Sequence, residues 1–159
     1  MSDLERVERQ NVADAIQLIR EAGYRDKASL LDDMLQNNDI IAFVPTNDAA
    51  KAKAFYKDVL GLKFVSDDGF AMVFDANGTM VRIAKSGKFT PQQFTILGWQ
   101  VKKIEDVVKK MRAKGVGFLT FPGMGQDESG VWPSPDGAAK VAWFKDPDGN
   151  TLSISEHFK

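Results

Sequence analysis

No cysteine occurs among the 159 residues of this chain, and the single histidine is His157. The absence of cysteine excludes disulfides, thiolate nucleophiles and zinc sites built from cysteine. With one histidine near the end of the sequence, no Ser-His-Asp or Cys-His arrangement can be assembled. The sequence also has no glycine-rich phosphate loop in the context that such a loop requires. We therefore name no catalytic residue, and the sequence leaves open whether the chain is an enzyme while favouring a binding protein.

Strong charge of either sign is also lacking. The net charge is −1 at pH 7, the pI is near 5.8, and the basic residues are spread along the chain, which argues against a nucleic-acid partner. No apolar run approaches the length of a membrane span and the N-terminus is charged, so neither anchoring nor export is indicated. We expect a soluble cytoplasmic protein. Its length and its 43% hydrophobic residues fit one domain with a buried core, alone or with a short additional segment.

In residues 1–37 the apolar residues recur at helical spacing. We predict that this segment is a helical extension, separate from the domain that follows. A first helix should end at Gly23, and a shorter one should run from about Asp26 to Asn37. Their apolar stripes predict packing on the outside of the main domain or on a partner subunit.

Residues 38–159 contain the same series of elements twice: a strand, a helix and three strands. The first series is predicted at 40–44, 48–60 (helix), 63–66, 70–74 and 79–84. The second series is predicted at 94–101, 103–114 (helix), 117–121, 138–144 and 150–155. Before the last strand of each series stands an acidic turn closed by glycine, Gly78 or Gly149, which indicates that the fold is built from two similar units.

A connection at 122–137, rich in Gly, Pro, Ser and acidic residues, is long for a compact domain, and such loops are commonly functional or disordered. Trp132 lies within it and could stack on a planar ligand at the mouth of a cavity, or could simply pack against the domain. For Phe43, Phe74 and Phe121 the ordinary interpretation is that they belong to the core.

The segment AFYKDVLGL at 54–62, preceded by a strand and Asp48, and the closing turn DPDGN at 146–150 resemble the vicinal oxygen chelate superfamily. This superfamily includes glyoxalase I, extradiol dioxygenases, fosfomycin-resistance enzymes and bleomycin-resistance proteins. The resemblance covers roughly residues 39–157. It implies an α+β fold of two βαβββ modules whose mixed sheets curl around a cavity, in many members as a homodimer.

Metal-dependent members of the superfamily place four ligands in that cavity, one from the first and one from the last strand of each module, usually His, Glu or Gln. The positions that match here are Ile41, Arg82, Ile96 and Ser153. Two aliphatic side chains, a guanidinium and a hydroxyl cannot hold a divalent ion. The resemblance therefore implies a member without a metal or another cofactor.

Two other metal sites were weighed. His157 shares a strand face with Ser153 and Ser155. A single histidine near a chain end is more commonly a polar surface side chain than a metal ligand. The DPDGN turn begins like a calcium loop, but Thr151 stands where that motif needs glycine and His157 where it needs glutamate.

The function expected is that of a metal-free, small-molecule-binding protein of the bleomycin-resistance type, active as a homodimer, with a planar or acidic ligand. The alternatives are a glyoxalase-like lyase or dioxygenase-like enzyme with an atypical metal site, and an interaction module built on the N-terminal helices. Arg82 should either meet an acidic group of the ligand or pair internally with an acidic residue such as Asp75. The predicted ligand-binding residues are Ile41, Phe43, Met80, Arg82, Ile96, Trp132, Ser153 and Ser155.

Overall fold

The structure is a computed structural model that describes residues 3–21 and 35–158. The chain divides into two compact units, Met1–Ile40 and Ile41–Lys159, which are described separately. The first unit contains helix α1 (Asp3–Glu21) and a single 3-10 turn, η1 (Leu35–Asn37). Most of the second predicted N-terminal helix falls in 22–34, outside the described residues. Among the helices that are described, none is both long and apolar enough to cross a membrane.

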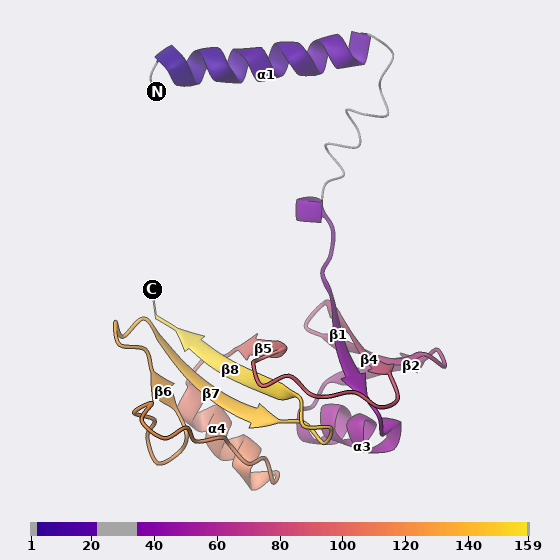
Figure 1. The fold of residues 1–159 in the computed structure, drawn as a ribbon, viewed down its shortest axis with the longest axis vertical. Helices are drawn as coiled ribbons and strands as arrows, with labels where there is room; N and C mark the ends of the chain where they lie inside the picture. Colours follow the sequence, from indigo (N-terminus) through magenta and orange to yellow (C-terminus); the bar gives the residue numbers. More distant parts are fainter. Residues whose placement is uncertain (1–2, 22–34, 159) are drawn as a thin grey trace. The chain divides into compact units, whose positions relative to one another are not determined.

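The second unit is built from two four-stranded sheets (Figure 1). The strand order is β1-β4-β3-β2 in one sheet and β5-β8-β7-β6 in the other. In each sheet the first and last strands of the module pair in parallel, and the remaining neighbours are antiparallel. This shared topology confirms an α+β fold of two similar modules, with sheets that do not close into a barrel. The strands are β1 (Ile41–Thr46), β2 (Lys63–Asp67), β3 (Ala71–Ala76), β4 (Thr79–Lys85), β5 (Leu97–Gln100), β6 (Trp132–Pro133), β7 (Ala139–Lys145) and β8 (Thr151–His157).

The closing glycines of the two predicted turns have the same backbone conformation, although the first turn has two residues between its strands and the second has five. Gly78 and Gly149 adopt φ angles of +89° and +88°, a left-handed region in which glycine has no steric cost. The amide of Gly78 donates to the Asp75 carboxylate at 2.7 Å, and that of Gly149 donates to the carbonyl of Asp146 at 3.0 Å. Each turn leads into the last strand of its module, as the repeat predicted.

One strand of the second module was predicted at the wrong place. Residues 117–121 form no strand, apart from an isolated bridge between Phe118 and Phe144, and the edge strand β6 is Trp132–Pro133 instead. The side chain of Gln126 explains this difference. It donates to the carbonyls of Leu119 and Gly130 and accepts from the amide of Phe121, so these backbone groups need no sheet partner.

The helix predicted at 48–60 consists of α3 (Ala49–Ala54) followed by a wider π-helical turn, η2 (Phe55–Val59). Asp48 caps α3 by accepting from the amide of Lys51.

The second predicted helix is α4 (Ile104–Ala113). The Glu156 carboxylate of β8 caps it by accepting from the amides of Lys103 and Ile104, at 2.8 and 3.0 Å. Both helices therefore lie where the sequence periodicity predicted them.

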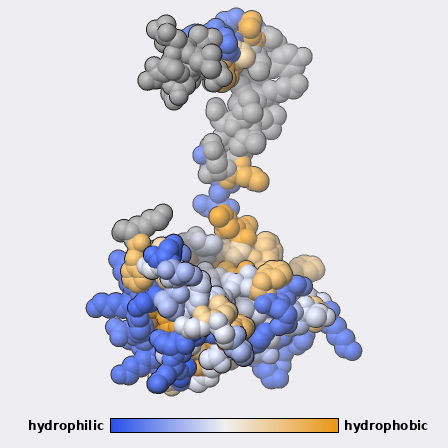
Figure 2. All heavy atoms as spheres, turned by 60° about the vertical axis from the view of Figure 1, so that its left-hand side comes forward, coloured by the Kyte–Doolittle hydropathy of each residue, from blue (hydrophilic) through white to orange (hydrophobic). Residues whose placement is uncertain are grey.

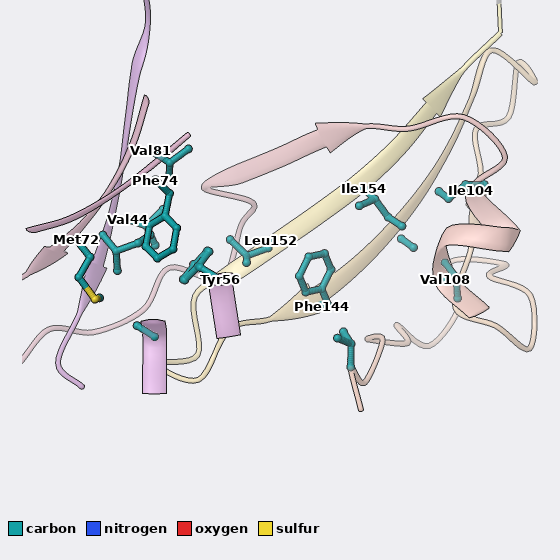
Figure 3. Close-up of a cluster of buried hydrophobic side chains, with 14 of the residues drawn as sticks. Val44, Tyr56, Met72, Phe74, Val81, Ile104, Val108, Phe144, Leu152 and Ile154 are labelled. Carbon is teal, nitrogen blue, oxygen red and sulfur yellow. The ribbon is translucent and has the colours of Figure 1, made fainter. Parts of the chain in front are cut away.

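A single hydrophobic core lies between the helices and the two sheets, and Figure 1 shows α3 and α4 on the same side of the sheets. Strand residues such as Val44, Phe74 and Leu152 point into it, and Figure 3 shows Tyr56 between the residues of the two sheets. Phe74 is fully buried, but the predicted core positions of Phe43 and Phe121 are wrong, since these residues are 61% and 39% exposed. Strand alternation turns Phe43 away from the helices, toward the uncovered face of its sheet.

Candidate functional site

The uncovered side of the first sheet, which we call the first face, is largely apolar. In the parallel pairing of β1 and β4, Ile41 lies beside Met80 and Phe43 beside Arg82. Because neighbouring strand residues in register share a face, these four side chains lie together on one side of the sheet. Ile41, Phe43 and Met80 are exposed, and Figure 2 shows hydrophobic surface on the larger unit where β1 begins.

A shallow depression of about 250 Å³ lies on this face beside Met80. It is lined by Val65, Val73, Phe74, Asp75, Gly78 and Met80. Because Asp75 pairs in register with Met80, an acidic residue lies on this face.

Arg82 is held by an internal ion pair. Its guanidinium contacts the Asp68 carboxylate at 2.5 Å, whereas Asp75 accepts from the amide of Gly78. Of the two roles predicted for Arg82, the structure therefore contains the internal pair, with Asp68 rather than Asp75 as the partner. The turn between β2 and β3 brings Asp68 next to β4, a contact that residue spacing alone does not show.

The pairing of Asp68 can be tested by titration. The amides of Ala71 and Phe70 and the guanidinium of Arg82 lower the pKa of Asp68 to about 2, with the Ala71 amide as the largest cause. Because this pKa lies below the value of about 3.9 for an unfolded chain, the carboxylate stabilises the fold above pH 3.9. That contribution is lost as the pH falls through 2.

NMR titration of the Asp68 side chain should therefore give a midpoint near 2. In Arg82→Met the midpoint should rise but remain below the unfolded value, since the backbone donors are unchanged. An ordinary midpoint for Asp68 in the unaltered protein would contradict this pairing.

The uncovered side of the second sheet, the second face, carries an aromatic cluster. The rings of Trp143 and Trp132 are 6.1 Å apart, and those of Trp143 and Phe121 are 5.7 Å apart in an edge-to-face arrangement. Trp132 is placed there by β6, where it pairs in register with Val141. The sequence marked Trp132 as a candidate but missed Trp143, although strand alternation in β7 puts Trp143 on the same side as Val141.

Hydroxyl groups lie next to this cluster. Ser153 of β8 pairs in register with Trp143 on one side and with Gly98 on the other. A Cβ atom at Gly98 would come within 2.7 Å of the Ser153 Oγ, so glycine leaves room for the hydroxyl in its present rotamer. Among the described residues, the Ser153 hydroxyl has no hydrogen-bond partner, whereas that of Ser155 lies 3.1 Å from the His157 Nε2.

The predicted ligand-binding residues thus form two groups on two sheets. Among the described residues, no hydrogen bond, ion pair or ring contact links the first face to the second. Ile96 belongs to neither group, because it precedes β5 and packs against the hydrophobic core. Its place in a cavity remains a prediction.

The side chains at the four matched positions do not fit the metal of the superfamily. Ile41 and Ile96 have no donor atom, Arg82 carries a positive charge, and Ser153 offers a neutral hydroxyl. Within residues 3–21 and 35–158, no three His, Cys, Asp or Glu side chains come together in a way that could hold an ion.

Comparison with solved structures identifies the fold. The chain matches a lactoylglutathione lyase from Agrobacterium tumefaciens with a TM-score of 0.58 and 18% identity, over 76% of this chain and 93% of that one. It matches the fosfomycin resistance protein FosX from Listeria monocytogenes with a TM-score of 0.60 and 13% identity, over 75% and 92% of the two chains. A glyoxalase/bleomycin resistance protein/dioxygenase from Alicyclobacillus acidocaldarius gives 0.59 and 17%, over 77% and 93%.

At these identities the solved structures show a common fold and nothing more. No curated protein sequence matches the chain. The model of one family does match, over residues 38–154, which is most of the chain and runs from the first strand of module one into β8, the last strand of module two. The chain therefore belongs to the glyoxalase/bleomycin resistance protein/dioxygenase superfamily, as its helix and turn motifs predicted.

Proposed function

We propose that the chain is a metal-free binding protein of the bleomycin-resistance type that holds a planar small molecule against the second face. The observation that carries this proposal is the aromatic cluster of Phe121, Trp132 and Trp143 beside the unpartnered hydroxyl of Ser153. Aromatic rings stack on planar ligands, and a few polar groups in such a site fix the orientation of the ligand. An acidic ligand is less favoured than a neutral one, because Asp68 already neutralises Arg82.

We further propose that a second copy of the chain completes the site. Ile41, Phe43 and Met80 leave an apolar sheet face exposed, and such a face commonly marks an interaction surface. In a two-fold dimer, the first face of one copy would cover the second face of the other, and the reverse contact would follow by symmetry. This arrangement brings the two groups of predicted residues to opposite walls of one cavity.

The proposal can be tested with 2-naphthol, a neutral planar probe, by calorimetric titration. Replacing Trp132 by alanine should weaken binding about tenfold, since one aromatic contact contributes about 1 kcal/mol beyond its buried area. Ser153→Ala should weaken binding by a smaller factor, because it removes one neutral hydrogen bond.

Trp99→Phe is the matched control, because the Trp99 ring lies on the core side of the second sheet, stacked on Phe144. It should leave the affinity for 2-naphthol unchanged. Equal affinities in the unaltered protein and Trp132→Ala would exclude the second face as the site. Stoichiometric metal in protein purified without chelators would instead favour a lyase-like or dioxygenase-like enzyme.

A further inference from the structure

A second cavity lies on the helix side of the sheets, away from both uncovered faces. It has a volume of about 260 Å³ and lies between elements of the two modules. Trp99, Phe144 and Ile154, which pack in or against the hydrophobic core, form one wall. The lining residues are Val59, Leu60, Leu62, Trp99, Gln100, Val101, Val107, Met111, Phe144 and Ile154.

The first module contributes the end of its helix to this cavity. In the π-helical turn η2, the amide of Leu60 donates to the carbonyl of Phe55 at 2.9 Å, five residues back. The wider turn lets Tyr56 point into the core while Val59 and Leu60 line the cavity. Single π turns inside α-helices are frequent at functional sites.

The second module contributes α4 and β5. Val107 and Met111 are four residues apart on α4, so they lie on one side of the helix and face the cavity together. The Trp99 ring stacks on Phe144, with ring centres 6.5 Å apart. Among the described residues, the Trp99 indole N–H has no hydrogen-bond partner.

A lysine joins the two modules at the edge of the cavity. The Lys114 ammonium donates to the carbonyl of Asp58 at 3.1 Å. Lys114 does not itself line the cavity, but its partner Asp58 directly precedes the lining residue Val59, so the ammonium is held one residue away from the cavity lining. An ammonium has three donors, and toward residues 3–21 and 35–158 this one uses a single donor.

We propose that this cavity binds a small amphipathic carboxylate, with its apolar part between η2 and α4 and its carboxylate on Lys114. Nine of the ten described lining residues are hydrophobic, Gln100 being the exception, and the polar groups near the cavity include two donors, the Trp99 N–H and the Lys114 ammonium. A carboxylate accepts from such donors and complements the positive charge. A cavity of roughly 150 Å³ holds benzene, so the larger volume here accommodates a chain of about eight carbons.

Octanoate is the probe, followed by two-dimensional NMR of the full chain. Titration should shift the amide signals of residues 59–62 and 107–111 in a saturable manner. Val107→Phe fills the cavity and should abolish these shifts. Lys114→Gln should weaken octanoate binding about tenfold, the value of one charge-assisted hydrogen bond. The same Lys114→Gln variant should bind octan-1-ol, which has no charge, with nearly unchanged affinity.

Lys109→Gln is the matched control, since it removes one lysine charge from α4, whereas Lys114 directly follows that helix and donates to Asp58 of the first module. It should leave octanoate binding unchanged, as should Trp132→Ala, which separates this site from the second face. Equal weakening of octanoate and octan-1-ol by Lys114→Gln would assign Lys114 a structural role and overturn the proposal. Octanoate shifts confined to the two uncovered faces would also overturn it. So would shifts at 107–111 that depend on protein concentration without octanoate, because a second copy would then fill the cavity.

Discussion

Replacing Asp146 by alanine is expected to lower the free energy of unfolding by about 4 kcal/mol, because several buried donors lose their acceptor at once. The Asp146 carboxylate is only 6% exposed. It accepts from the Tyr56 hydroxyl at 2.8 Å, from the amides of Asp148 and Asn150 at 3.0 and 2.9 Å, and from the Asn150 side chain at 2.8 Å. Chemical denaturation with urea, followed by tryptophan fluorescence, measures the loss.

Two further variants define the effect. Tyr56→Phe removes one of the four donors and should cost about 1–2 kcal/mol. Burial, helped by the Asp146 charge, raises the pKa of Tyr56 well above its ordinary value, so the hydroxyl remains a donor in the neutral range. Glu128→Ala, at an exposed site, should change stability by less than about 0.5 kcal/mol. A similarly small change in Asp146→Ala would show that the turn does not hold the modules together.

The size of this effect follows from the position of the DPDGN turn between the modules. The Asp148 carboxylate accepts from the hydroxyl of Thr46 at 2.6 Å and from the amide of Asn47 at 2.9 Å. The Asn150 side chain donates to the carbonyl of Pro45 at 2.9 Å. The turn that closes the second module is therefore bonded to the end of β1 in the first. These bonds fix the position of one sheet relative to the other within a chain, and therefore the relative position of the two faces.

Replacing Phe43 by aspartate is expected to dissociate the proposed homodimer. Phe43 lies beside Arg82 on the first face and is exposed within one chain. In the dimer it would be covered, and a carboxylate at that place would have to give up its water beside a guanidinium that Asp68 already neutralises. Since a two-fold interface contains each residue twice, the dissociation constant should rise about 100-fold or more. Analytical ultracentrifugation over a range of concentrations measures it.

Phe94→Asp makes the same change at another exposed phenylalanine, in the segment before β5 and outside both faces. It should leave the association unchanged. If the unaltered protein sediments as a monomer at high concentration, or if both variants dissociate alike, the first face is not the dimer interface. The second face would then have to bind its ligand without cover from a partner.

Local sequence signals predicted most of the fold correctly, because they act over a few residues. Asp48 caps α3, the glycines of the two acidic turns adopt positive φ, and helix α4 lies where its apolar period put it. The errors arose where a distant side chain decides the outcome. Gln126 satisfies the backbone near Phe121 and prevents a strand there, and Asp68 takes the guanidinium of Arg82.

The sequence by itself determined the two-module fold, the family, and the non-ligand residue types at the four matched positions, Ile41, Arg82, Ile96 and Ser153. All of these depend on residue identity and spacing. Only the tertiary structure decided that the predicted site residues lie on two separate sheet faces and that a second cavity forms between η2 and α4. Strand and helix periods show which residues share a face. Which helix, sheet or subunit covers that face depends on how whole elements pack. The spacing of apolar residues in one strand or helix does not identify the element that packs against it.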